Sequence, residues 1–369
     1  MPRTHRRLVA ALAGLLAVAL TASSCSDDTA EGAVTSSTTT SSTTTSIGVP
    51  TTSGAPPTPT TAAPARPVAS IGCGAEAPAP GIETLALATA DGLTRSYRRF
   101  IPSSYDPDEP IPVVLNFHGL SGSPEAQVLL SQLEPVAEAE GFVLVHPQGT
   151  VAASLGATFW NNEPGASSLD DPTLKVDDVA FVEQMLDQLQ SDLCVDLRLI
   201  YSTGMSNGGM FTSRLACDLS ERLAAVATVA GVLHPDDCDP TRPIPLLHIH
   251  GTADTIVPFD VGPSILGDEI MDALTGSIRS IPDQVDDWSD AYDCSATPTV
   301  VAVSDTVERR EYRECDDGGA VDFYVVTDGG HTWPGVDLAP GLEAVLGVTT
   351  LDIDGAAVVW DWFERHPLT

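Results

Sequence analysis

Short apolar segments recur at intervals along the chain, and stretches with helical spacing of apolar residues separate them. The segments at residues 112–117, 142–147, 199–203, 225–229 and 246–250 are apolar and β-prone, as is typical of strands buried on both faces. Strands that alternate with helices form a mostly parallel sheet with helices on both of its faces. The pattern therefore predicts an α/β fold.

The same pattern predicts elements at both ends of this series. Residues 84–90 and 94–102 flank an Asp-Gly pair and predict a hairpin of edge strands. Residues 358–363 predict a closing helix. Residues 323–326 are strand-like. About 300 residues are thus available to one large α/β domain.

One helix carries a start signal of its own. Asp178 is a plausible N-cap, because apolar residues follow it on one helical face as far as Leu193. Asp177 stands beside it, so the two resemble a carboxylate pair. Capping and solvation explain the two carboxylates better than a catalytic role does.

The first 25 residues are typical of a bacterial export signal. Arginines precede an apolar run at residues 8–20, and small residues then lead to Cys25. The run is too short for a comfortable membrane span. Small residues before a cysteine predict lipoprotein cleavage and a lipid-modified Cys25, with ordinary secretion as the alternative. The protein is therefore expected outside the cell or at its surface, with membrane contact only through the lipid.

Residues 26–70 consist mainly of Ser, Thr, Ala and Pro and have no apolar periodicity. This composition predicts a disordered tether and is also typical of O-glycosylated segments. The catalytic domain is expected at residues 71–369.

A G-x-S-x-G segment carries the clearest chemical signal. It occupies residues 204–208, between the strand-like segment that ends at residue 203 and a helical segment that begins at residue 209. In that context it predicts a nucleophile elbow, which presents Ser206 at the top of a sheet. A plain turn of small residues is the alternative.

A nucleophilic serine needs a base and an acid that orients the base. In folds with this elbow the chain order is Ser, then Asp or Glu, then His. Asp254 follows the strand at 246–250, and His331 lies in a glycine-containing loop after the strand at 323–326. The order and the strand ends therefore select Ser206, Asp254 and His331.

The other histidines fit this role less well. His366 stands three residues from the C-terminus, in a segment expected to fray. His118 precedes the serine and is interpreted as a structural loop residue. His248 and His250 share one face of a strand and could mimic a metal site. No third ligand is evident, so we expect buried histidines near the site and no metal.

An oxyanion hole requires two backbone N–H groups. The residue after the nucleophile, Asn207, supplies the first. The loop after the strand at 112–117 supplies the second, which we assign to the Leu120 amide with Ser121 as its close alternative.

Four segments of the chain together resemble a known family. Residues 116–119, 176–182, 204–210 and 330–335 together look like the secreted esterases that include polyhydroxybutyrate depolymerases, feruloyl esterases and acetyl xylan esterases. The resemblance runs from about residue 73 to the C-terminus. It implies an α/β-hydrolase fold and an extracellular serine ester hydrolase that needs no cofactor. Its implied triad agrees with the three residues selected above.

The sequence departs from the family at two points. Some relatives carry a cysteine where this chain has Leu120, but only the backbone is used there. Many depolymerases of solid polyester add a substrate-binding domain, whereas this chain stops soon after residue 363. We therefore expect short-chain, aryl or oligomeric esters as substrates.

Cysteine number agrees with export. The chain has seven cysteines, and without Cys25 six remain, which is an even number that suggests three disulfides. The resemblance and local proximity favour the pairs Cys73–Cys194, Cys217–Cys238 and Cys294–Cys315.

The charge balance excludes some partners. The formal net charge is −34 at pH 7, from 17 Lys and Arg against 51 Asp and Glu. Such a surface repels nucleic acid and anionic lipid, so it suggests neutral substrates or a salty medium.

The substrate pocket is the least determined part. Trp160, in the long loop at 149–176, and Trp333, two residues after His331, are candidate substrate-binding aromatics, or they simply cover the core. Residues 261–279 form either a lid or a surface insertion. Two other functions stay open: a peptidase or acyltransferase on this fold, and a non-catalytic surface binding protein. The oligomeric state is not indicated.

Overall fold

The computed structural model describes residues 66–162, 171–275 and 279–368. The export signal, Cys25 and nearly all of the predicted tether lie outside these residues.

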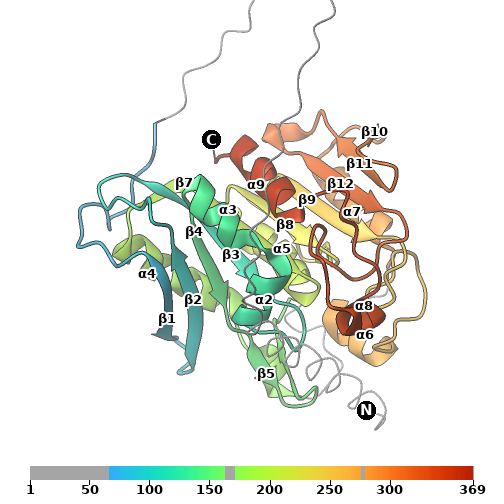
Figure 1. The fold of residues 1–369 in the computed structure, drawn as a ribbon, viewed down its shortest axis with the longest axis horizontal. Coiled ribbons are helices and arrows are strands. Elements are labelled where there is room, and N and C mark those ends of the chain that lie inside the picture. The colour runs from blue at the N-terminus through green and yellow to red at the C-terminus, as the bar shows by residue number, and fades with distance from the viewer. Residues whose placement is uncertain (1–65, 163–170, 276–278, 369) are drawn as a thin grey trace, which may run out of the picture.

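A ten-stranded sheet forms the centre of the protein (Figure 1). Its middle strands are parallel, and the two strands at one edge and the two at the other join it in antiparallel pairs. The spatial order is β1 (Gly81–Ala88), β2 (Thr94–Ile101), β4 (Val143–Pro147), β3 (Ile111–Phe117), β7 (Val195–Met205), β8 (Ala225–Val229), β9 (Leu246–Gly251), β12 (Val321–Val326), β11 (Val307–Tyr312) and β10 (Thr299–Ala302). All the strands and the hairpin predicted from the apolar pattern are therefore confirmed, and β7 begins earlier than expected.

Helices cover both faces of the sheet. The helices α3 (Leu133–Glu140) and α9 (Gly355–Arg365) contribute to one buried cluster, on the face toward the viewer in Figure 1. The helices α4 (Asp178–Asp192), α5 (Asn207–Asp218) and α7 (Ile281–Ala291) contribute to the cluster on the opposite face. The predicted α/β fold with a closing helix is thus confirmed.

Shorter elements gather below the carboxyl ends of the parallel strands, at the lower edge of Figure 1. They are α2 (Pro124–Ser131), β5 (Thr150–Ala152), β6 (Ala157–Phe159), a 3-10 turn at Pro172–Lys175, α6 (Asp268–Thr275) and α8 (Pro340–Leu346). A second 3-10 turn, Asp316–Gly318, lies between β11 and β12. In parallel α/β sheets, ligands bind at the edge formed by the carboxyl ends of the strands.

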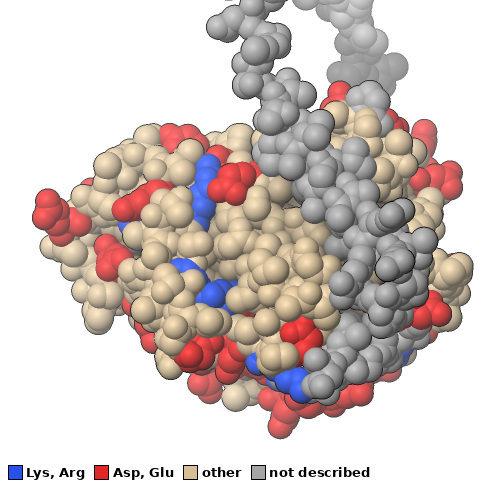
Figure 2. Space-filling model, turned by 90° about the horizontal axis from the view of Figure 1, so that it is seen from below, with Lys and Arg blue, Asp and Glu red and all other residues tan. Residues whose placement is uncertain are grey.

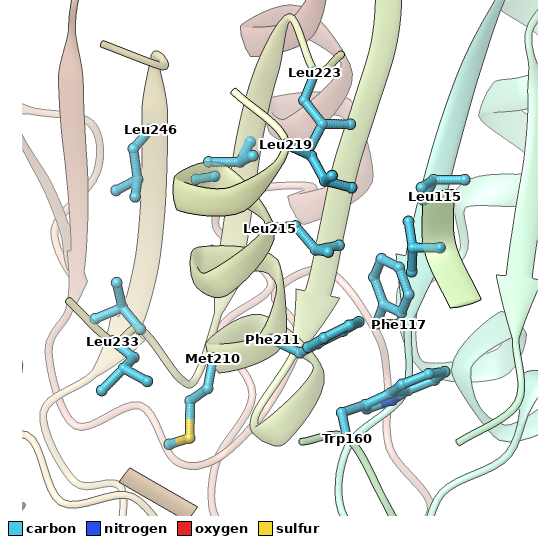
Figure 3. Packing of buried hydrophobic residues seen from close by; sticks show 14 of the residues in the cluster. Leu115, Phe117, Trp160, Met210, Phe211, Leu215, Leu219, Leu223, Leu233 and Leu246 are labelled. Atoms are coloured by element: carbon cyan, nitrogen blue, oxygen red, sulfur yellow. The ribbon is translucent and has the colours of Figure 1, made fainter. Parts of the chain in front are cut away.

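Helix α5 packs directly on the sheet (Figure 3). Its Phe211 and Leu215 point toward Phe117 and Leu115 of β3, and Trp160 lies against Phe211. The Phe211 and Trp160 rings are stacked with centroids 5.2 Å apart and planes 9° from parallel. Burial of the apolar surface of each of these large side chains contributes about 1.5–3 kcal/mol, and together they hold the start of α5 in place.

No helix in the described residues is long and apolar enough to cross a membrane.

The start of α4 differs from the prediction. Asp177, not Asp178, is the N-cap, and its carboxylate accepts a hydrogen bond from the Ala180 N–H at 2.9 Å. Asp178 is the first helical residue and is buried. Its carboxylate pairs with the buried Arg95 at 2.7 Å and accepts from the Asn161 N–H at 2.8 Å. Apolar periodicity could not show which of the two neighbouring aspartates caps the helix, because Arg95, the partner of Asp178, comes from a hairpin strand that is distant in the sequence.

The folded part begins slightly before residue 71. Ser70 N–H donates to Val195 O, and Leu197 N–H donates to Val68 O, so residues 68–70 pair with β7. Composition alone placed these residues in the tether, because a segment that pairs through its backbone needs no apolar pattern.

Three disulfides join the predicted pairs, Cys73–Cys194, Cys217–Cys238 and Cys294–Cys315. The inferred pairing is therefore confirmed for all six cysteines of the described residues.

Candidate active site

Ser206 stands at the turn between β7 and α5. Its backbone has φ 58° and ψ −126°. This conformation is unfavourable for any residue that has a side chain, and it is seen mainly where the surrounding structure enforces it. A Cβ on Gly204 would lie 2.4 Å from the Gly208 carbonyl oxygen, and a Cβ on Gly208 would lie 2.3 Å from the Phe117 carbonyl oxygen. The two glycines of the motif are therefore required by close backbone approach, and they hold the elbow against β3.

His331 and Asp254 meet at the same edge of the sheet. The His331 Nδ1–H donates to Asp254 Oδ2 at 2.7 Å. The other carboxylate oxygen, Oδ1, accepts from the N–H groups of Ile256 and Val257 at 2.8 and 2.9 Å. Because Nδ1 carries the proton, Nε2 of a neutral His331 is left as an acceptor, which is the form that a general base requires.

The environment of Asp254 keeps its carboxylate charged. Burial alone would raise its pKa, but the electrostatic interaction with His331 and the hydrogen bonds from His250 and His331 outweigh it. The net effect holds the pKa of Asp254 well below its usual value of 3.8. An ionised acid at this position stabilises an imidazolium when one forms.

Ser206 and His331 border one cavity of about 70 Å³, together with the loop that follows β3. Apart from these two side chains and the loop backbone, its wall is largely aliphatic. The apolar side chains are those of Leu120, Ala126, Leu130, Met205, Ile256, Leu266 and Leu346, and Gln127 also borders the cavity. The structure thus places the predicted serine and histidine at one largely apolar cavity, and the predicted aspartate is bonded to that histidine.

The loop after β3 borders this space with residues 118–122. Ser121 N–H is engaged with Thr158 O at 2.9 Å, which leaves the Leu120 amide as the better candidate donor of the two. Asn207 is the first residue of α5, so its N–H has no intrahelical acceptor. The Asn207 side chain instead binds both backbone groups of Trp160, at 2.8 and 3.0 Å.

His118 fixes the same loop from within. Gly149 N–H donates to its Nε2 at 3.0 Å, so the proton is on Nδ1, which lies 2.8 Å from Gly119 O. Burial lowers the pKa of His118 to about 4. The side chain borders the cavity, but both of its nitrogens are occupied by backbone groups, which agrees with a structural role.

Both candidate tryptophans lie in the core. Trp160 is 0 % and Trp333 is 1 % exposed, and neither borders the cavity beside Ser206. Trp160 donates its indole N–H to His118 O at 3.0 Å and so supports the loop from behind. Of the two roles considered for these residues, the placement favours covering the core.

Residues 261–279 contribute to the cavity wall through Leu266. Helix α6 within this stretch buries Ile270, Met271 and Leu274. Residues 276–278 lie outside the described part, as do residues 163–170 of the long loop at 149–176.

His366 is not frayed. It ends α9, its Nδ1 bonds to Trp362 O at 2.7 Å, and its ring lies 3.9 Å from the Trp362 ring. Its neighbour Leu368 bonds to Arg198 near the start of β7, whereas Ser206 follows the end of that strand. The cap and the aromatic contact order this tail, and apolar periodicity does not reveal such a contact.

No group of three or more His, Cys, Asp or Glu side chains within the described residues is arranged to hold a metal ion. His248 and His250 are fully buried and bond to each other, as expected for histidines near the site.

Sequence reasoning did not find the aliphatic wall. Leu130, Ile256, Leu266 and Leu346 come from four separate segments, and each is an ordinary apolar residue in its own segment. A weak signal was available for Ile256 alone, because it stands two residues after the predicted acid.

Figure 2 shows the face of the molecule at the carboxyl ends of the parallel strands. Asp and Glu side chains spread around its border, uncharged residues fill much of its middle, and Lys and Arg are few.

No protein-family model matches the chain. It is 32% identical over 289 residues to NocK of Nocardia uniformis subsp. tsuyamanensis, which is named as an esterase, and the match covers 73% of this chain and 79% of that protein. It is 26% identical over 235 residues to feruloyl esterase B of Piromyces equi, a match covering 62% of this chain and 41% of that protein. The solved acetyl xylan esterase from Aspergillus awamori has a TM-score of 0.50 and 14% identity, covering 76% of this chain and 99% of that one. The last likeness concerns the fold alone.

Proposed function

The chain belongs to the α/β-hydrolase esterases, the family that includes feruloyl and acetylxylan esterases, and we propose that it hydrolyses carboxylic esters through Ser206, His331 and Asp254. As a member of this family it is a carboxylic ester hydrolase. One observation carries the assignment of residues: the 2.7 Å bond between His331 and Asp254 lies at the cavity that the strained Ser206 also borders.

The reaction follows from the positions of these groups. His331 Nε2 removes the Ser206 proton as Oγ attacks the ester carbonyl, and Asp254 stabilises the resulting imidazolium. The amides of Leu120 and Asn207 bind the oxyanion. His331 then protonates the leaving alcohol, and water repeats the cycle on the acyl-enzyme to release the acid.

The cavity suggests the kind of ester. Its aliphatic wall offers an apolar acyl or aryl group a place beside Ser206, and its small volume favours short groups. We propose soluble short-chain, aryl or oligomeric esters as substrates. A panel of p-nitrophenyl acetate and butyrate, methyl ferulate, acetylated xylan and hydroxybutyrate oligomers would rank these classes by kcat/KM.

We propose that the enzyme works outside the cell. The three disulfides support an oxidising compartment, and the export-type N-terminus supports secretion or lipid anchoring at Cys25. Mass spectrometry of the N-terminal peptide from cells would test the lipid directly.

The residue assignment is tested by Ser206→Ala. It should lower turnover of p-nitrophenyl butyrate on the order of 10³-fold or more and abolish labelling by a fluorophosphonate, with an unchanged circular dichroism spectrum. His331→Ala should be comparably damaging.

His366→Ala is the matched control, because this histidine lies toward the opposite end of β7. It should keep its turnover and lose only some stability. A Ser206→Ala enzyme that keeps more than about a tenth of the wild-type rate would refute the assignment. Inactivation by His366→Ala but not by His331→Ala would show that the wrong base was chosen.

A further inference from the structure

A second set of buried polar side chains lies behind the His331–Asp254 pair. His248 and His250 are alternate residues of β9, and Thr228 stands opposite His248 on the neighbouring strand β8. All three are buried, with exposures of 0 to 1 %. None of them borders the cavity at Ser206. They therefore act, if at all, through the residues that do.

These side chains form a continuous series of contacts that ends on the triad acid. His250 Nε2 lies 2.9 Å from Val257 O and 3.3 Å from Asp254 Oδ2, the oxygen that also accepts from His331. His250 Nδ1 lies 3.0 Å from His248 Nε2. His248 Nδ1 lies 2.7 Å from Thr228 Oγ1.

The chemistry of the atoms fixes where the protons are. The two neighbours of His250 Nε2 are a carbonyl and a carboxylate oxygen, which only accept, so Nε2 must carry its proton. In a neutral ring His250 Nδ1 is then an acceptor, and His248 Nε2 must donate to it. His248 Nδ1 becomes an acceptor in turn, which leaves the Thr228 hydroxyl as its donor. With both rings neutral, this arrangement satisfies all four ring nitrogens, and it requires the Thr228 hydroxyl to donate to His248 Nδ1 at 2.7 Å rather than to Leu247 O, which lies 3.3 Å away.

Burial supports the neutral form of the inner ring. It lowers the pKa of His248 well below the usual value of 6.5. The Thr228 carbonyl oxygen also lies 3.1 Å from His248 Nδ1. This oxygen would favour the opposite tautomer if the Thr228 hydroxyl were absent.

We propose that His250 is a positioning residue for the triad acid and that Thr228, through His248, sets the tautomer that His250 needs; this inference rests on the proposed function. His250 donates to Val257 O, and the Val257 N–H donates to Asp254 Oδ1 at 2.9 Å. The turn after β9 and the carboxylate are thereby held from two sides. Oδ2 is kept pointing at His331, so the series contributes to kcat rather than to substrate binding.

The sharpest test is a hydroxyl deletion far from the substrate. Thr228→Val keeps the shape of the side chain, but His248 Nδ1 loses its donor and faces only the carbonyl of residue 228. The His248 tautomer should flip, so that His250 Nε2 faces two oxygens without its proton. We expect kcat for p-nitrophenyl butyrate to fall about tenfold, by analogy with the loss seen when the hydrogen-bond partner of a metal-bound histidine is removed, with KM nearly unchanged. The downfield proton resonance of the His331–Asp254 bond should shift.

Thr228→Ser is the matched control. It restores the hydroxyl and should recover most of kcat and the resonance of the wild-type enzyme. A merely structural role of Thr228 would leave that resonance in place and would change thermal stability alone.

The same logic applies at His250. His250→Gln keeps a donor near the position of Nε2 and should retain more activity than His250→Phe, which keeps a ring but no donor and should lose about 10–100-fold in kcat. Circular dichroism of each variant shows whether it is folded. If His250→Phe does not fold, the Thr228 pair and His250→Gln still decide the matter.

Two outcomes overturn the inference. One is wild-type kcat and an unshifted resonance in Thr228→Val. The other is a Thr228→Ser enzyme as impaired as Thr228→Val. Failure of the proposed function looks different, because Ser206→Ala would then remain active and wild-type protein labelled by the fluorophosphonate would still turn over ester.

Discussion

Ser206 shows how a single residue can be held in an unfavourable conformation. A backbone of this kind costs on the order of 1–3 kcal/mol and persists only when its surroundings determine it. Here the Ser206 N–H donates to Val229 O of β8 at 2.8 Å, and its carbonyl accepts from Met210 in the first turn of α5 at 2.9 Å. The strand and the helix thus place the hydroxyl together, and neither alone would do so.

Because His118 is buried, we expect the folded protein to lose stability in mild acid. Its pKa is about 4 in the folded protein, because burial disfavours the charged ring, against 6.5 when exposed. The unfolded chain therefore binds an extra proton between these values, so the stability from neutral His118 is complete above pH 6.5 and is lost as the pH falls toward 4. The loss amounts to about 3 kcal/mol. Urea unfolding of the wild type and His118→Gln at pH 7.5, 5.5 and 4.5 measures it.

The comparison isolates His118 because the other buried histidines titrate in both proteins. The variant should be less stable at pH 7.5 but should lose less stability on acidification. Parallel curves for the two proteins would show that His118 does not carry this proton linkage.

At the scale of elements, the start of α4 separates two neighbouring carboxylates. Asp177→Ala removes an exposed cap and should lower the free energy of unfolding by about 1 kcal/mol. Asp178→Ala leaves Arg95 buried without its partner, next to the Phe181 ring, and should cost about 3–5 kcal/mol. Chemical denaturation of both variants measures the difference. Equal losses would mean that the Arg95 pair contributes little.

The elements themselves could be predicted from sequence because each leaves a local pattern. Strands buried on both faces are apolar throughout, and the predicted acid and base both follow such strands. The partner of Asp178 and the core position of Trp160 leave no local signal, since both depend on contacts between distant segments. The cavity wall also leaves no local signal, because its residues, such as Leu266 and Leu346, come from separate connections. Local pattern thus locates the reacting groups, while the shape of the pocket depends on how the loops pack.

At the scale of the whole molecule, the disulfides tie together parts that are distant in sequence. Cys73–Cys194 joins the segment before β1 to the start of β7, across a sequence separation of 121. The other two bridges close loops of separation 21. Loop entropy assigns about 5 kcal/mol to the first bridge and about 3 kcal/mol to each of the others. The longest bridge therefore constrains the unfolded chain most, at the end of β7 opposite to Ser206.

The overall charge predicts how the enzyme discriminates between substrates. With a net charge of −34 and acidic side chains around the face in Figure 2, an anionic ester is repelled before it reaches Ser206, whereas a neutral ester is not. Salt screens this repulsion, because the Debye length falls from about 10 Å at 0.1 M to about 3 Å at 1 M. The kcat/KM of an anionic aryl ester should therefore rise several-fold over that range.

A neutral aryl ester with the same leaving group is the control, and its kcat/KM should change by less than about twofold, because no long-range charge acts on it. The ratio of the two values removes any general effect of salt on the enzyme. Stopped-flow or plate measurements at five ionic strengths would give the slope. A ratio that stays flat would mean that the acidic border does not extend its field to the cavity. The selection of substrates would then depend on the aliphatic wall around Ser206 alone.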